Sequence, residues 1–333
     1  MKLRIHFTSD DLMRIRIAEP PDYLWELVNS VHLLQNSEGR LLFRNLRESA
    51  LECTRDDRES SRLLRVLMTL SPYSDYFPDF LTPTAGHKDL ESGIDAVLST
   101  PIPRLREELA LLGSGRRMPS WVDAMARGDT EVLRLLGTAM RWYHDDMLGP
   151  LWPTIRAALR ADREHRTRTL LRGGGEALLT TLGAGTRWRS PVLEADYPVE
   201  HDVHLEGRGV VLVPSFFCWK SPVTLADPAM TPVIVHPIDR DLLWSSTLGV
   251  RSGDASGLVS LMGATRARVL ETVVELEMAT TGTVATTAGL SAPTASKHLT
   301  VLRDAGLIQS RPEGRRVLHW PTRLGTDLLR KGG

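Results

Sequence analysis

Apolar residues recur at intervals of three and four positions through most of the first 185 residues. This spacing, interrupted by prolines, predicts helices over residues 20–36, 40–52, 57–70, 89–98, 103–112, 119–127, 129–147, 150–171 and 175–183. Residues 2–7 alternate between apolar and polar side chains and predict a strand, after which Thr8 or Ser9 is suited to cap a short helix. We therefore expect one strand followed by a largely helical region.

Near residue 187 the helical spacing gives way to short apolar runs. These runs predict strands at Val192–Glu194, Asp202–Leu205, Gly209–Val213 and Pro232–Val235. The glycine-containing segment Glu206–Gly209 favours a hairpin between the second and third strands. Residues 251–257 form a polar, glycine-containing stretch, as in a flexible link. We expect an α+β fold that is mostly helical, with a large N-terminal domain (1–250) ending in a small sheet.

The C-terminal domain, expected over residues 258–330, has the pattern of helices joined by a sharp turn. In the first predicted helix Val269, Val273 and Leu276 lie on one stripe. The next helix ends before Gly289, a residue that allows a left-handed turn. Ser291 is a suitable N-cap for a third helix, and this order of elements predicts a helix-turn-helix. Three apolar positions of the third helix are expected to face inward: Ala295, Leu299 and Leu302.

The outward face of this third helix and the hairpin after it carry candidate DNA contacts. The N-terminal part of such a helix enters the major groove, where hydroxyl and ammonium groups can reach bases or phosphates. The outward residues are Thr294, Ser296, Lys297 and Thr300. Two alternating segments, Leu307–Arg311 and Arg315–Trp320, predict a hairpin wing that turns at Pro312–Gly314. Three arginines near its tip suit phosphate or minor-groove contacts: Arg311, Arg315 and Arg316.

Three segments of this domain resemble ArsR-type winged-helix repressors. Leu261–Leu270 is similar to their opening helix, Leu290–Leu299 to their recognition helix, and Leu302–Ile308 to its exit. The resemblance implies a homodimer that binds a palindromic operator in double-stranded DNA. It also implies that five residues face the bases, namely Ser291, Pro293, Thr294, Ser296 and Lys297. Residues 207–217 and 232–237 resemble the large extension of certain actinobacterial ArsR-like regulators, which implies no chemistry.

Metal and cofactor chemistry finds little support in the residues. The metal-sensing members of the family have a Cys-x-Cys pair where this chain has Thr283–Ala288, which contains no ligating side chain. The only cysteines are Cys53 and Cys218, too few for a four-cysteine zinc site. His201 and His204 would point to opposite faces of a strand, and His144–Asp146 is more readily a solvated helix face. We expect no metal and no cofactor.

An enzymatic role is not expected either. Gly173–Gly175 lacks the Lys-Ser/Thr of a phosphate-binding loop and is better explained as a joint between helices. Ser215 follows a proline and lies outside any Gly-x-Ser-x-Gly nucleophile motif. No paired carboxylate motif identifies an acid and a base. The alternative of an enzyme domain fused to a DNA-binding tail therefore has no motif in its favour.

Aromatic residues are concentrated between positions 121 and 244. They can be core residues, because aromatic side chains bury a large area, or they can line an apolar effector pocket. The side chains that we consider as pocket walls are Trp142, Tyr143, His144, Trp152 and Trp219. Only Lys220 and Arg240 are basic between Phe216 and Trp244, so the expected effector is a largely hydrophobic organic molecule.

The charge distribution points to the same division of roles. The 41 basic and 41 acidic residues of the chain balance, but residues 258–333 hold 10 basic and 6 acidic side chains, a net +4. The rest of the chain therefore carries −4, so only the C-terminal domain is suited to approach a polyanion. No apolar run approaches 18 residues, and the start lacks the apolar core of a signal peptide. We expect a cytoplasmic protein with no membrane partner.

These observations lead to one principal hypothesis and one further alternative. The principal hypothesis is a dimeric, sequence-specific transcriptional regulator with an effector bound in its N-terminal domain, and repression is the favoured sign of regulation. The alternative, besides the fused enzyme, is an architectural or protein-interaction regulator that has no effector.

Overall fold

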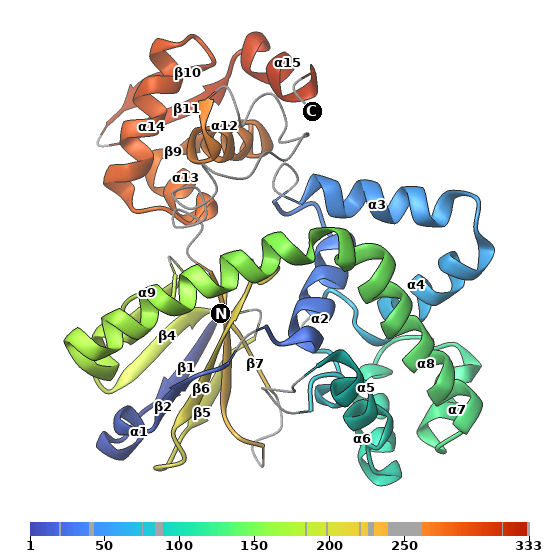
Figure 1. Cartoon of the computed structure of the whole chain (residues 1–333). Helices are drawn as coiled ribbons and strands as arrows, with labels where there is room; N and C mark the ends of the chain where they lie inside the picture. The colour runs from blue at the N-terminus through green and yellow to red at the C-terminus, as the bar shows by residue number, and fades with distance from the viewer. Residues whose placement is uncertain are drawn as a thin grey trace. The chain divides into compact units, whose positions relative to one another are not determined.

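The computed structural model (Figure 1) describes residues 1–333 with the exception of 20, 40–42, 75, 84–88, 184, 198, 220, 226–229, 239–261, 315 and 332–333. The side chains of residues 330 and 331 are also outside this description. The chain divides into two compact units. The first comprises Met1–Glu38, Phe43–Leu182 and Thr186–Ile238, and the second comprises Gly39–Leu42, Gly183–Gly185 and Asp239–Gly333. The predicted link 251–257 lies outside the described residues.

Helices make up most of the first unit, as the apolar spacing predicts. They are α1 (Ser9–Met13), α2 (Tyr23–Leu34), α3 (Arg44–Arg55), α4 (Arg58–Leu70), α5 (Leu90–Leu98), α6 (Ile102–Leu112), α7 (Ser120–Ala126), α8 (Thr130–Trp142) and α9 (Trp152–Leu179). A short 3-10 helix, η1, covers Asp79–Leu81. The predicted cap of α1 is confirmed: Thr8 Oγ1 accepts from the backbone N–H of Asp11 at 3.2 Å, and the Asp11 carboxylate accepts from the Thr8 N–H at 2.8 Å.

The helical path through residues 129–179 differs from the predicted one. Instead of one helix to residue 147, α8 ends at Trp142 and passes into a π-helix, η2 (Tyr143–Leu148), and a 3-10 turn, η3 (Gly149–Leu151). The glycine joint is confirmed, because Gly174 breaks α9 with φ 70° and ψ −169°. Such a conformation is accessible to glycine but strained for a residue with a Cβ.

Two four-stranded sheets replace the single small sheet that we expected. One has the order β3-β4-β1-β5 and the other the order β2-β6-β8-β7. The strands are β1 (Lys2–His6), β2 (Ile15–Ile17), β3 (Thr186–Arg189), β4 (Val192–Asp196), β5 (His201–His204), β6 (Val210–Ser215), β7 (Val223–Thr224) and β8 (Val233–Pro237). In the second sheet β6 runs parallel to both β2 and β8, while β7 runs antiparallel to β8.

The predicted hairpin at Glu206–Gly209 is wrong. The strands on its two sides belong to different sheets, because β5 pairs with β1 and β6 pairs with β2. The chain changes sheet through three residues with positive φ, namely Glu206 (54°), Gly207 (81°) and Gly209 (71°). The Asp11 carboxylate accepts from the Gly209 N–H at 2.8 Å and so ties this crossing to α1.

The core of the first unit joins the start of the chain to its middle. Leu3, Ile5 and Phe7 of the N-terminal segment pack with Leu178 and Leu179 at the end of α9 and with apolar residues of β4, β6 and β8. Figure 1 shows α9 running along one side of these sheets. The N-terminal residues are therefore part of the sheet architecture rather than a separate strand ahead of a helical region.

The second unit contains the C-terminal elements in the predicted order. They are α12 (Ala264–Leu276), β9 (Ala279–Thr280), α13 (Thr281–Ala288), α14 (Ala292–Asp304), β10 (Ile308–Glu313), β11 (Arg316–Pro321) and α15 (Arg323–Lys331). The three strands form a sheet of order β10-β11-β9. Val269, Val273 and Leu299 belong to one buried cluster at the centre of these helices. The α+β prediction for the whole chain is confirmed, and no described helix has the length and apolarity that a membrane crossing requires.

Candidate nucleic-acid interface

The turn between α13 and α14 depends on capping groups and one glycine. The Thr280 hydroxyl caps α13 by accepting from the Thr283 N–H at 3.2 Å. Gly289 ends the helix in the left-handed conformation, with φ 67° and ψ 37°. The next N–H, that of Leu290, returns to the carbonyl of Ala285 at 2.8 Å. The predicted glycine turn is therefore confirmed, and it sets the direction in which α14 leaves.

Helix α14 has the inward and outward faces that the sequence predicts. Ser291 is its N-cap and accepts from the Thr294 N–H at 3.3 Å, while Pro293 lies in the first turn, where its missing N–H costs nothing. Ala295, Leu299 and Leu302 are buried. Five predicted contact residues are exposed on the surface: Ser291, Pro293, Ser296, Lys297 and Thr300. Thr294 is half-buried.

The exposed polar groups of α14 are not equally available to a ligand. The hydroxyls of Ser291 and Thr294 lie 2.8 Å apart and bond each other, and Thr300 donates to the carbonyl of Ser296 at 3.0 Å. Lys297, by contrast, makes no hydrogen bond or ion pair with any described residue. The Lys297 ammonium, like the Ser296 hydroxyl, which bonds no described residue either, can therefore approach DNA without giving up an internal bond.

The wing differs from the prediction in its turn. Residues Pro312 and Glu313 are in β10, opposite Val317 and Arg316 of β11, so the predicted turn at Pro312–Gly314 is wrong. Strand β10 extends two residues beyond the predicted end, to Glu313, and the turn begins at Gly314, whose φ is 60°. Pro312 fits this strand because β10 is an edge strand of its sheet, where a missing N–H breaks no ladder.

Two of the three wing arginines lie on one face of the hairpin. Arg316 is directly opposite Glu313, and Arg311 is two residues before Glu313 on the same strand. Opposed residues and residues two apart share a face, so Arg311 and Arg316 point to the same side. Both are exposed. Arg315, the third candidate, lies outside the described residues.

A buried histidine that the sequence analysis missed connects the wing to the helix-turn-helix. The ring nitrogens of His319 in β11 bond the hydroxyl of Thr281 at the start of α13 (2.9 Å) and that of Ser310 in β10 (2.8 Å). Burial, together with the charge of Arg303, lowers the pKa of His319. The alternation of β11 could have placed this side chain inward, and its effect is to hold the wing against α13.

The residues considered for an effector site lie in aromatic contacts of the first unit. Tyr143 is fully buried at the start of η2, and Trp142 lies against it at a centroid distance of 6.3 Å. Trp152 stacks on Tyr23 at 4.8 Å, with the His144 ring edge-on to it at 4.9 Å. Trp219 meets the ring of Phe43 edge-on at 5.5 Å.

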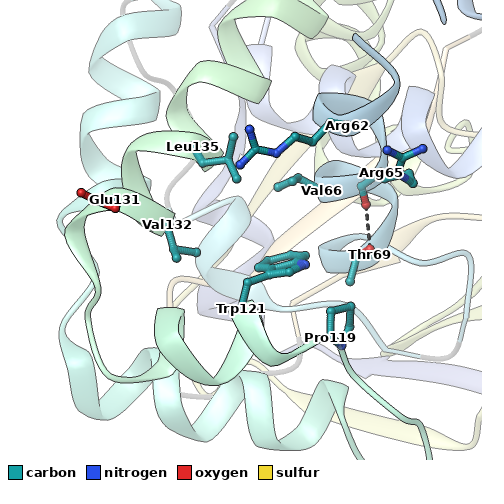
Figure 2. A pocket seen from close by; sticks show the side chains of 9 residues that line it. All are labelled: Arg62, Arg65, Val66, Thr69, Pro119, Trp121, Glu131, Val132 and Leu135. Carbon is teal, nitrogen blue, oxygen red and sulfur yellow. Dashed lines mark hydrogen bonds between the residues drawn. The ribbon is translucent and has the colours of Figure 1, made fainter. Parts of the chain in front are cut away.

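A cavity of about 480 Å³ opens elsewhere in the first unit, between α4, α7 and α8 (Figure 2). It is lined by Arg62, Arg65, Val66, Thr69, Pro119, Trp121, Glu131, Val132 and Leu135. None of the five residues considered as pocket walls is among them. Trp121 belongs to the aromatic-rich part of the chain, but it is not one of the side chains considered as pocket walls.

The histidines considered as metal ligands have other neighbours. The ring of His204 stacks on that of His6 at 4.3 Å, His6 in turn bonds Asp202 at 2.8 Å, and His144 bonds Asp145 at 2.9 Å. His201 and His204 lie at the two ends of β5, three residues apart. Among the described residues no group of three or more His, Cys, Asp or Glu side chains is arranged to hold a metal ion.

The comparison with protein families identifies the C-terminal elements. A family model described as a helix-turn-helix domain matches residues 262–311, which extend from two residues before α12 into β10. No curated protein and no solved structure matches the chain. The match agrees with the capped α13–turn–α14 geometry. The second unit thus contains a DNA-binding helix-turn-helix domain of the kind found in transcriptional regulators.

Proposed function

We propose that this protein is a sequence-specific transcriptional repressor that binds a palindromic operator as a homodimer. The single observation that carries the proposal is the exposed face of α14, where Lys297 and Ser296 stand on a helix held by the Ser291 cap and a buried apolar side. A recognition helix needs such an outward polar face to reach base edges in the major groove. Arg311 and Arg316, on one face of the wing, add cations for the phosphate backbone.

The dimer and the sign of regulation are supported by the likeness to ArsR-type repressors. Leu261–Leu270 and Leu290–Leu299 carry that likeness, and dimeric winged-helix proteins bind two half-sites related by a two-fold axis. One α14 reads only a few base pairs, so two copies would supply the specificity that a single site in a genome needs.

The first unit, in this proposal, senses an organic effector and performs no reaction. Ligand control requires that the effector bind one state of the protein more tightly than another. The cavity between α4, α7 and α8 supports such a role, because its volume lies in the range of small-molecule sites.

Selection of binding sites from random DNA duplexes by the purified full-length chain tests the proposal. We expect enrichment of one inverted repeat and, by native mass spectrometry, two protomers on each selected duplex. Binding should fall steeply with salt concentration, as phosphate contacts require. An unenriched pool, or one protomer on each duplex, would contradict the proposed operator and dimer. A reporter gene behind the selected sequence, repressed in cells that contain the protein, tests the sign of regulation.

A further inference from the structure

The cavity in the first unit has walls of two chemical kinds. Figure 2 shows the indole of Trp121, from α7, in the middle of the lining, with Val132 of α8 on one side and Val66 of α4 on the other. Trp121, Val66, Val132 and Leu135 provide an apolar surface that is buried or half-buried. A flat apolar group placed there would lose its contact with water and could stack on the indole ring.

Arginine side chains from α4 border this apolar surface. Arg62 and Arg65 are both exposed, and Figure 2 shows the Arg62 guanidinium reaching across toward Leu135, whereas that of Arg65 is turned away from Trp121. The carboxylate of Glu131, the acidic group of the lining, is turned outward in the same view. The space next to Trp121 is therefore approached by a positive charge from α4.

Neither arginine side chain is held by a buried ion pair with a described residue. Arg62 lies 3.6 Å from Glu59, but more than half of each side chain is exposed, and such surface pairs contribute little. The Arg65 side chain makes no ion pair with any described residue, although its carbonyl accepts from Thr69 Oγ1 at 2.7 Å. A guanidinium binds a carboxylate through two parallel N–H···O bonds, which an amide cannot reproduce.

We propose that this cavity binds a small aromatic carboxylate. The apolar ring lies against Trp121 between Val66 and Val132, and the carboxylate accepts from Arg62, with Arg65 able to swing in as a second donor. The ligand class thus shares the apolar body of the hydrophobic effector expected from the sequence but adds an anionic group. The role of this ligand as the effector rests on the function proposed above, whereas its binding to the cavity does not.

Calorimetric titration of the full-length protein tests the proposal with defined probes. The probes are benzoate, phenylacetate and 1-naphthaleneacetate, together with 1-naphthaleneacetamide as the uncharged match of the third. We expect 1-naphthaleneacetate to bind at least about tenfold more tightly than its amide, because a charge-assisted bond is lost in the amide. Absence of binding by all three acids up to millimolar concentration, or equal affinity for the acid and the amide, would overturn the proposal.

Variants locate the site within the fold. Arg62→Gln combined with Arg65→Gln should weaken 1-naphthaleneacetate binding about tenfold or more, whereas Arg58→Gln should leave it unchanged. Arg58 is a matched control because it is an exposed arginine of the same helix outside the lining. Val132→Phe fills the cavity from α8 and should abolish binding without lowering the melting temperature by more than a few degrees. Unchanged binding in both the double arginine variant and Val132→Phe would place the ligand elsewhere and overturn the assignment.

Operator binding, measured on the same proteins, separates this inference from the function it builds on. The double arginine variant and Val132→Phe should bind operator DNA like the unmodified protein, since the helix-turn-helix is untouched. Failure to bind any operator while 1-naphthaleneacetate still binds at this cavity would refute the proposed repressor and leave the binding site standing.

Discussion

At the scale of single residues, the interface depends on which polar groups have no internal partner. Ser291, Thr294 and Thr300 bond within α14, which stabilises the helix, whereas Lys297 extends from it without such a bond. The positions of these side chains follow from local sequence signals, a cap and an apolar stripe, and were predictable. Their internal hydrogen bonds were not, since a hydroxyl can bond either its own helix or a base.

Lys297→Ala should weaken binding to the selected operator by about 1–3 kcal/mol if its ammonium donates to a base. Binding to unrelated duplexes should change much less. Arg266→Ala is a suitable control, because Arg266 is an exposed cation on α12 whose guanidinium donates to the carbonyl of Met262 at 3.3 Å. Fluorescence anisotropy with operator and scrambled duplexes measures both effects. An equal loss for the two duplexes would make Lys297 a phosphate contact instead.

Glu26 makes the stability of the first unit depend on pH. Its buried carboxylate accepts from the N–H groups of Phe216 and Phe217 at 2.8 and 3.2 Å, and burial raises its pKa to about 8. The folded protein therefore binds a proton that the unfolded chain releases between about pH 4.5 and 8. The contribution of Glu26 to stability is present below this window and is lost as the pH rises through it.

Glu26→Gln should remove this pH dependence. Relative to the variant, the unmodified protein should lose free energy of unfolding by at most about 1.4 kcal/mol for each pH unit between 4.5 and 8. Urea unfolding at pH 5, 6, 7 and 8 gives the difference between the two proteins. A difference that stays constant across the series would mean that the carboxylate is already ionised in the folded state.

At the scale of elements, local signals predicted the helices well and the sheets poorly. Gly289 ends α13 and Ser291 caps α14, so two neighbouring residues are sufficient to predict the turn of the helix-turn-helix. The pairing of β1 with β4 joins residues about 190 positions apart, and β2 has only three residues, so no local pattern reveals either. The π-helix η2 likewise follows α8 without a break in the helical path, and no local residue signal in Tyr143–Leu148 marks the change from α-helical to π-helical hydrogen bonds.

The wing should contribute affinity without sequence preference. Arg311→Ala combined with Arg316→Ala should weaken binding to all duplexes and reduce the slope of log K against log salt concentration by about one unit for each lost phosphate contact. The same titration of the unmodified protein between low and moderate salt is the reference. If neither the affinity nor the slope changes, the face shared by Arg311 and Arg316 does not contact DNA.

Metals should not release DNA through the site that metal-sensing ArsR-type repressors use, because α13, which corresponds to that site, has no ligating side chain. Its sequence, Thr281–Ala288, contains only Thr, Gly, Val and Ala, none of which binds zinc, cadmium or arsenite well. We expect the anisotropy of an operator complex to stay constant as each metal is added. Release of DNA that a chelator reverses would require a ligand set formed by other residues, with His144 and Asp145 as the first to replace.

At the scale of the whole molecule, the chain combines two units with separate apolar cores. Among the residues that the structure describes, the core cluster of the second unit lies between Met262 and Leu329, and that of the sheets lies between Leu3 and Ile234. A unit with its own core is expected to fold by itself. The polar, glycine-containing stretch before the return of helical spacing predicts a boundary at residues 251–257, which lie outside the described residues, whereas the two units divide after Ile238.

A fragment of residues 258–333 should therefore fold alone and bind DNA without any response to aromatic carboxylates. The described residues of its buried cluster all lie between Met262 and Leu329, so we expect cooperative thermal unfolding and helical circular dichroism. Affinity for the operator should fall toward that of unrelated duplexes if the first unit supplies the dimer contacts, since one recognition helix makes few base contacts. Native mass spectrometry of the fragment and of the full chain distinguishes the two cases. A fragment that dimerises and binds the operator like the full chain would place the dimer contacts in the second unit, whereas a fragment without cooperative unfolding would show that the two cores depend on each other.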